Sequence, residues 1–228
     1  MIISIHQSQY LPWPPYFKKI AKSDVFVVLD DVQFQKNGVQ NRNKLRNQQE
    51  DFWLTIPVRG GLKDNINKKE IADSRWKKKH HLSIKQSYSK SRFWEIYNHE
   101  IEEIFQNDRK YLHEINNDFL KFFLKTFEIE TKIFLSSEIN VKGSKSDLVL
   151  NICKYFGAKK YLSGIGSKDY LDLKSFEKEK VEIEFLDFNS PKYEQYHGDF
   201  ISDLSMLDML MNVEKQEIIN NYLLGSNN

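Results

Sequence analysis

The stretch that decides the fold is residues 2–31, IISIHQSQYLPWPPYFKKIAKSDVFVVLDD. A short apolar run at 2–5 ends on His6, and a second one at 25–29 ends on Asp30 and Asp31. Between them lie an aromatic, proline-rich loop and an amphipathic helix, and strand–helix–strand is the opening unit of a parallel α/β sheet. Ligands bind beyond the carboxyl ends of such strands, so the two polar ends indicate a site.

The rest of the chain alternates between strand-like and helical patterns. Strands are expected at 52–58, 132–135, 159–162 and 181–186, with a short one at 69–71, while 32–50 is expected to be a long polar loop. Apolar spacings of three and four predict three helices between 75 and 127, and further helices at 144–156, around 176 and within 204–224. These patterns predict a Rossmann-like, mostly parallel α/β sheet flanked by helices. We expect a single domain over 1–228 with a helical insertion, or cap, at about 75–128.

Composition limits the class of protein. Among 228 residues, 34 Lys and Arg face 32 Asp and Glu, and a net charge of +2 does not favour a general polyanion binder. The single cysteine cannot form an internal disulfide and fits a reducing compartment. No run of about 18 apolar residues is present to span a membrane. We therefore expect a cytoplasmic location, whereas the oligomeric state is left open.

The end of the first strand carries the strongest candidates. His6 suits proton transfer or a phosphate contact, and Gln7 stands beside it. Tyr10 and Trp13 could stack on a base or a sugar ring. The alternative interpretation is a hydrogen-bonded histidine among core aromatic residues.

Asp30 and Asp31 form the second cluster, at the end of the second strand. Adjacent carboxylates point to opposite sides of an extended chain, so only one is expected to face a given site. That carboxylate could orient an amine, take its proton or hold Mg²⁺ beside a nucleotide. The alternative is an aspartate that caps a turn.

Two polar loops could hold a sugar or a phosphate. In the first, Arg42 could bind a phosphate with two hydrogen bonds while Asn41 and Asn43 contact sugar hydroxyls. In the second, Tyr193 and Gln195 could form a sugar-binding wall. A solvated loop and simple aromatic packing are the respective alternatives.

A glycine-containing loop follows the predicted strand at 159–162. Gly164 and Gly166 allow a ligand to approach the backbone closely, and Ser167 and Lys168 could meet a phosphate. A plain strand-to-helix turn would use the same glycines. The sequence has no Cys/His metal pattern, Walker-type loop or nucleophile elbow.

Taken in order, these motifs resemble the WbqC-like family, which is associated with gene clusters for bacterial O-antigen and other surface polysaccharides. The resemblance runs through HQSQYLPWPPYFKKIAKSDVFVVLDDVQFQK, NRNK, WLTIPV, WKKKHH, YLSGIGSKDYLD and PKYEQYHGDFISDLSMLDML. It implies transfer of an aminoacyl (glycyl-type) or acyl group to an amino sugar or a sugar nucleotide. The chain departs from the family pattern at Ser8, commonly proline, and at Pro15, often glycine, and both changes affect the backbone near the expected ligand.

A fainter resemblance links the strand, histidine loop, helix and second strand to the opening of the nucleotidylyltransferase superfamily. The stretch GSKDYL is similar to a later phosphate loop of that superfamily, but its usual second histidine has no counterpart here. The resemblance implies ATP, with Mg²⁺, and an acyl-adenylate stabilised by His6 and Lys168. A sugar amine would then attack, held by the 41–43 loop, while Asp30 or Asp31 accepts its proton.

Three hypotheses remain open from the sequence. The first is the transferase just described, and the second is a nucleotidylyltransferase that activates a sugar phosphate. The third is a non-catalytic partner of a glycan assembly enzyme. A nucleic acid is expected only if an aminoacyl-tRNA is the donor.

Overall fold

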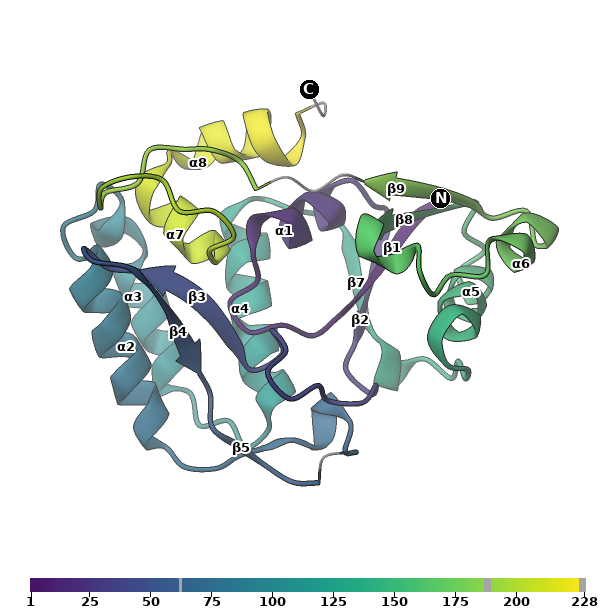
Figure 1. Cartoon of the computed structure of the whole chain (residues 1–228), viewed down its shortest axis with the longest axis horizontal. Coiled ribbons are helices and arrows are strands. Elements are labelled where there is room, and N and C mark those ends of the chain that lie inside the picture. The colour runs from purple at the N-terminus through teal and green to yellow at the C-terminus, as the bar shows by residue number, and fades with distance from the viewer. Residues whose placement is uncertain (62, 187–189, 226–228) are drawn as a thin grey trace.

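Five parallel strands form the centre of the computed structural model, which describes residues 1–61, 63–186 and 190–225. Across the sheet their order is β7 (Lys132–Leu135), β2 (Val25–Leu29), β1 (Ile2–Gln7), β8 (Lys160–Gly164) and β9 (Glu182–Leu186). The chain proceeds outward from β1 to β2 and β7, and then returns to the other side of β1 for β8 and β9 (Figure 1). The strand order therefore reverses between β1 and β8, and the predicted Rossmann-like fold class is confirmed.

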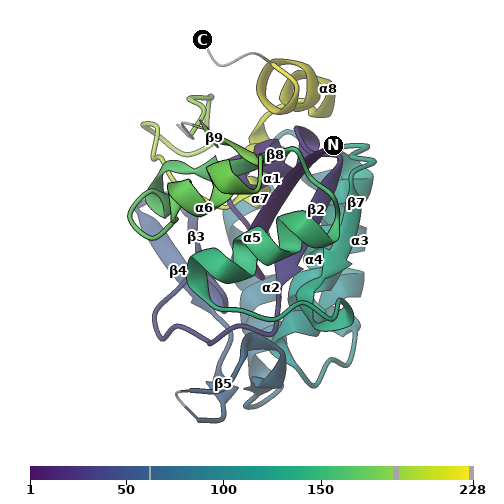
Figure 2. The ribbon, with the colours of Figure 1, turned by 90° about the vertical axis from the view of Figure 1, so that its right-hand side faces the viewer.

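Each face of the sheet has its own apolar core. Phe26 and Val28 pack with α1 (Pro14–Ala21) and α4 (Leu112–Thr126), whereas Val25 and Val27 pack with α5 (Lys145–Tyr155) and α6 (Leu173–Lys178). Figure 2 shows α5 and α6 on the face of the sheet that is turned toward the viewer. Alternate residues of a strand point to opposite faces, so a strand buried on both sides is apolar throughout, as 25–29 is.

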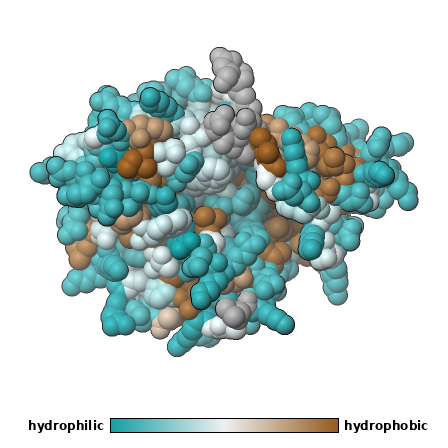
Figure 3. Space-filling model, in the orientation of Figure 1, coloured by the Kyte–Doolittle hydropathy of each residue, from teal (hydrophilic) through white to brown (hydrophobic). Residues whose placement is uncertain are grey.

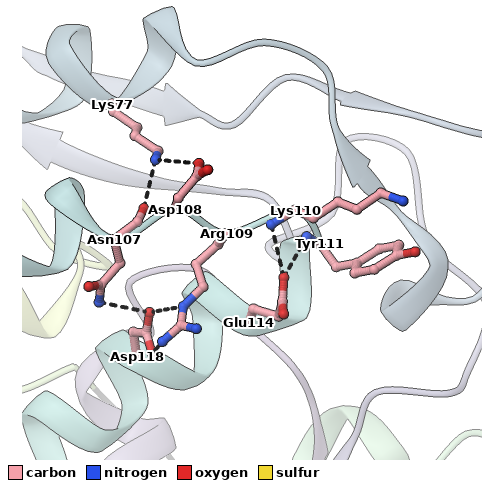
Figure 4. A network of polar contacts seen from close by, with 8 residues as sticks. All are labelled: Lys77, Asn107, Asp108, Arg109, Lys110, Tyr111, Glu114 and Asp118. Atoms are coloured by element: carbon pink, nitrogen blue, oxygen red, sulfur yellow. Dashed lines mark hydrogen bonds and ion pairs between the residues drawn. The ribbon is translucent and has the colours of Figure 1, made fainter.

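The three helices predicted between 75 and 127 are confirmed as α2 (Arg75–Tyr88), α3 (Trp94–Gln106) and α4. Polar contacts fix the turn between α3 and α4 (Figure 4). Arg109 binds both carboxylate oxygens of Asp118, at 2.7 and 3.0 Å, and Lys77 Nζ of α2 donates to the carbonyl of Asn107 at 2.6 Å. Glu114 accepts from the Tyr111 amide at 2.7 Å, which closes the first turn of α4.

The segments between β2 and α2 correct two predictions. Residues 32–50 are not all loop, because β3 (Arg42–Arg46) pairs antiparallel with β4 (Asp51–Thr55). The strand predicted at 52–58 does not join the parallel sheet, since it divides into β4 and β5 (Val58–Arg59), and β5 pairs with β6 (Glu70–Ile71). An antiparallel pair can expose one face, so it accepts polar residues that a central parallel strand would exclude.

Short helices complete the chain. The 3₁₀ turns η1 (Ile66–Lys68), η2 (Ser136–Glu138) and η3 (Ile165–Ser167) follow β5, β7 and β8 respectively. At the C-terminal end lie α7 (Met206–Asn212), α8 (Lys215–Glu217) and the π-helical segment η4 (Ile218–Leu223). Among the described residues, no helix combines the length and apolar character that crossing a membrane requires.

Candidate functional site

A cavity of about 530 Å³ opens where the strand order reverses, between β1 and β8. In open α/β sheets this is where ligands bind. Figure 3 shows hydrophobic residues in the recess near the middle of one face of the molecule, among hydrophilic ones. The cavity is lined by Ile5, His6, Gln7, Trp13, Pro15, Tyr16, Lys19, Leu29, Val149, Tyr161, Ser163, Gly164, Ile165, Gly166, Ser167 and Tyr170.

His6 lies at the carboxyl end of β1, on the cavity wall. Its ring meets the ring of Tyr16 edge to face, with centroids 5.2 Å apart. Its Nδ1 atom lies 3.2 Å from the carbonyl of Gln7 and 3.3 Å from the side-chain amide of Gln9. Burial, with a smaller contribution from the nearby Lys19, lowers the pKa of His6 to about 3. At neutral pH His6 is therefore an uncharged imidazole in the free protein.

Lys19, on α1, lines the same cavity as His6. It is only 3% exposed, and its Nζ donates to the carbonyl of Ile5 at 2.9 Å. No ion pair joins it to a carboxylate within the described parts of the chain, and burial lowers the pKa of Lys19 to about 7. An anion that enters the cavity would supply the missing counter-charge and raise this pKa.

The loop at 8–13 places Trp13 in the cavity wall, and hydrogen bonds from other segments hold this loop. Leu11 adopts a left-handed backbone conformation, with φ of 45°, and its carbonyl accepts from Asn43 Nδ2 at 2.6 Å. The next carbonyl, that of Pro12, accepts from the Met206 amide at 2.8 Å. A left-handed leucine costs about 1–2 kcal/mol, so these bonds are what hold the loop in this conformation.

We expect Asn43→Ala to loosen this loop and weaken ligand binding in the cavity. The carbonyl of Leu11 would lose its buried donor, and the free energy of unfolding should fall by about 1–3 kcal/mol. AMP serves as the probe, because the resemblance to nucleotidylyltransferases implies an adenylate. Its Kd, measured by calorimetry, should rise about threefold to tenfold, as for a bond worth about 1 kcal/mol.

Asn41→Ala is the matched control for Asn43→Ala. Its Nδ2 donates at 2.8 Å to the carbonyl of Ile56, which lies outside the loop. Asn41→Ala should destabilise the fold to a similar extent and leave the Kd of AMP unchanged. Equal Kd values for the two variants would contradict a role for Asn43 in holding the loop.

The far wall of the cavity comes from the end of β8 and from η3. Ser163 and Ser167 lie 2.5 Å apart through their hydroxyl oxygens, and Ser167 Oγ also donates to the carbonyl of Gly164 at 2.8 Å. A β-carbon added at Gly166 would meet nothing within 4 Å, so this side of the cavity has room for a ligand. Of the residues singled out in the sequence, His6, Gln7, Trp13, Gly164, Gly166 and Ser167 converge here.

Several other predicted site residues lie outside the cavity wall. Tyr10 is fully buried, with its hydroxyl 2.9 Å from His80 Nδ1 on α2. Lys168 points away, with Nζ 5.0 Å from the centre of the Phe185 ring. The structure thus places Lys168 next to the loop that lines the cavity without bringing it to His6.

The two aspartates after β2 lie outside the cavity wall and contact η2. Asp30 is 1% exposed, and its carboxylate accepts from Ser136 Oγ at 3.1 Å and from the amide and hydroxyl of Ser137 at 3.0 and 2.7 Å. Asp31 contacts the hydroxyl of Ser136. These bonds join the end of β2 to η2, and neither carboxylate lines the cavity.

The polar loops also have structural partners. The guanidinium of Arg42 stacks on Trp53, 4.2 Å from the ring centre. Tyr193 donates to the buried carboxylate of Asp208 at 2.8 Å. Gln195 accepts from Arg46 at 2.6 Å, so the 193–195 loop is tied to β3 and α7. None of these side chains lines the cavity between β1 and β8.

Sequence reasoning missed Lys19 as a site residue. The apolar face of α1 runs through Tyr16 and Ile20, and Lys19 lies on that face, whereas Lys18 and Lys22 are more exposed. A lysine on the buried side of an amphipathic helix was the available signal. Tyr16, Ser163 and Tyr170 also line the cavity.

The donor set of the cavity favours an anionic ligand over a metal held by the protein. Its lining offers an ammonium, an imidazole and hydroxyls but no carboxylate, and oxygen anions are what Mg²⁺ prefers. Over the described ranges, no three His, Cys, Asp or Glu side chains gather closely enough to hold a metal ion.

The sheet order and the cavity at its reversal define an α/β protein of the Rossmann-like class with a cavity at the switch point. The chain belongs to the WbqC-like protein family, whose family model matches residues 7–220. It is 29% identical over 215 residues to a Mycobacterium tuberculosis protein, "Uncharacterized protein Rv1507c", with 92% of this chain and 93% of that one covered. No solved structure matches the chain.

Proposed function

We propose that this protein is a transferase that joins an aminoacyl (glycyl-type) or acyl group to an amino sugar or sugar nucleotide in bacterial surface-polysaccharide biosynthesis. The observation that carries the proposal is the pairing of Lys19 with a neutral His6 in one cavity that has no carboxylate. An ammonium there would bind an anionic donor, and an uncharged imidazole would receive a proton. Both groups would assist amide formation from an activated acid and an amine.

The donor is assigned as an acyl-adenylate formed from ATP. An amino-acid carboxylate oxygen attacks the α-phosphorus of ATP, and pyrophosphate leaves with the electrons of the broken P–O bond. Lys19, protonated in the presence of the phosphate, stabilises the charge on the reacting phosphoryl group. Magnesium is assigned to the phosphates of ATP, since the cavity offers it no carboxylate.

The second step transfers the acyl group. The sugar amine attacks the acyl carbon, AMP leaves, and the proton lost by the nitrogen passes to Nε2 of His6. In the free protein this imidazole is a weak base, but an adenylate beside it would raise its pKa toward the range useful for general base catalysis. The flat, mostly apolar walls that include Trp13, Tyr16 and Tyr170 suit a nucleobase or a sugar ring.

The test is incubation with ATP, glycine and a UDP-linked amino sugar, followed by mass spectrometry of the sugar and an assay of pyrophosphate. A glycyl adduct that depends on ATP and is abolished in His6→Ala supports the proposal. Lys168→Met is the matched control, because this lysine lies outside the cavity wall, and it should retain activity. No adduct and no pyrophosphate with any standard amino acid would refute adenylation.

A nucleotidylyltransferase is the second candidate, because the same cavity would suit a nucleoside triphosphate. It would release pyrophosphate when given ATP and a sugar phosphate, with no amine present. A non-catalytic glycan partner, in contrast, would tolerate His6→Ala without loss of polysaccharide in the producing cell.

A further inference from the structure

Gln9 contacts His6 from the interior of the protein. It lies in the loop after β1, is 3% exposed, and presents its side-chain amide to His6 Nδ1 at 3.3 Å. Its oxygen, Oε1, is buried and has no hydrogen-bond partner among the described residues. Buried amide oxygens rarely stay unpaired, because an unsatisfied buried acceptor costs about 1–3 kcal/mol.

The second neighbour of Nδ1 also favours a proton on this atom. The carbonyl of Gln7 lies 3.2 Å from Nδ1 and can only accept a hydrogen bond. If Nδ1 were unprotonated, its lone pair would face this carbonyl. If Nδ1 carries the proton, it donates to Gln7. The Gln9 amide as placed would then point an N–H at the N–H of Nδ1, and a half-turn that brings Oε1 to Nδ1 removes this clash and gives the unpaired oxygen a donor.

We infer that Gln9 is a positioning residue, which holds His6 in the tautomer protonated at Nδ1 and leaves Nε2 as a proton acceptor. This deepens the proposed function, on which its catalytic use rests: with Nε2 unprotonated, His6 can take a proton from the attacking amine. The opposite tautomer would present an N–H to the amine and could not accept its proton. Neither tautomer carries a charge, so the cavity's cation remains Lys19.

The tautomer is measurable on the free protein by long-range ¹H–¹⁵N correlation NMR, with the signals of His6 assigned by their loss in His6→Gln. We expect Nδ1 to show the shift of a protonated nitrogen and Nε2 that of an unprotonated one. In Gln9→Met the preference should decline toward the Nε2–H form, which imidazole side chains favour in water. A wild-type protein with Nε2 protonated would overturn the inference.

Gln9→Glu is the matched variant, because a carboxylate can still accept from Nδ1–H. It should keep the wild-type tautomer and raise the pKa of His6 through its negative charge. In the transferase assay, kcat of Gln9→Met should fall about 10- to 100-fold with little change in KM for ATP, and Gln9→Glu should recover most of it. Equal tautomer populations in Gln9→Met and wild type would contradict the positioning role, whatever reaction the protein catalyses.

Discussion

Lys19→Met is expected to remove anion binding while leaving the protein at least as stable as before. The variant loses the cavity's ammonium, and hydrogen bonds that involve a charged group are worth about 1.5–3 kcal/mol. The Kd of AMP, measured by calorimetry at pH 7, should therefore rise about 10- to 100-fold. Transferase activity should fall by at least the same factor as the affinity for AMP.

The stability of Lys19→Met should change in the opposite direction from its binding. Because the pKa of Lys19 in the folded protein is about 7, the unfolded chain binds a proton that the folded protein releases between pH 7 and the usual lysine value of 10.5. The wild type thus gains stability as pH rises through this window. Replacing a buried charge by an apolar side chain of similar size can add about 1–4 kcal/mol, from which the lost bond to the Ile5 carbonyl must be subtracted. The net unfolding free energy at pH 7 should therefore rise modestly, and its pH dependence should flatten.

Lys19→Arg tests whether charge at this position controls binding. In the wild type, AMP binding needs the protonated amine, so the Kd should rise about tenfold per pH unit above pH 7 until the pKa of the complex is reached. Arginine stays protonated, so this variant should bind AMP with a Kd that hardly changes between pH 7 and 9. A wild-type Kd that is equally flat would show that Lys19 does not bind the anion.

Asp30→Ala is expected to destabilise the fold by about 3–5 kcal/mol, the largest loss of stability predicted here. The carboxylate is buried and accepts from Ser136 Oγ and from the amide and hydroxyl of Ser137. Its removal breaks these three bonds at the junction of β2 and η2, although Ser136 Oγ keeps its contact with Asp31. Urea denaturation followed by circular dichroism measures the change. AMP should still bind to the folded fraction with wild-type affinity.

Asp30→Asn separates structure from catalysis. An amide keeps one acceptor for these donors and has nearly the same shape, so the loss should be about 1–2 kcal/mol. A catalytic carboxylate would behave otherwise: Asp30→Asn would abolish turnover in a stable protein. That result would support the catalytic role that the sequence predicts for Asp30.

The parallel strands were predictable because burial on both faces leaves little choice of residue. Val25 to Leu29 is apolar throughout and forms β2 with the predicted bounds. Lys132 to Leu135 also forms β7 with the predicted bounds, although this edge strand is only partly buried. β3 was not predictable in the same way. Its Arg42 and Lys44 face Thr55 and Trp53 of β4, and a pair of strands with a partly exposed face has no continuous apolar signal.

The site was predictable where a residue's position follows from the strand that carries it. His6 and Gly164 end neighbouring strands of the sheet, and parallel strands bring such ends together. Lys168 follows Ser167 by one residue, yet the turn of η3 directs it to Phe185. Which way a loop side chain points depends on local turn geometry and packing, which residue type alone does not determine.

The helical layer has a consequence for recombination between relatives. Asn116 of α4 donates to Ser8 Oγ at 3.0 Å and to the carbonyl of Gln40 at 2.9 Å, and Gln40 in turn donates to Gln7 Oε1 at 2.8 Å. A chimera that exchanges residues 75–126 alone would pair foreign helices with the native loop after β1. Where a relative has proline at position 8, the hydroxyl that Asn116 contacts is missing. We expect viable crossovers to carry the 8–13 loop and α4 together, although about a hundred residues separate the two segments.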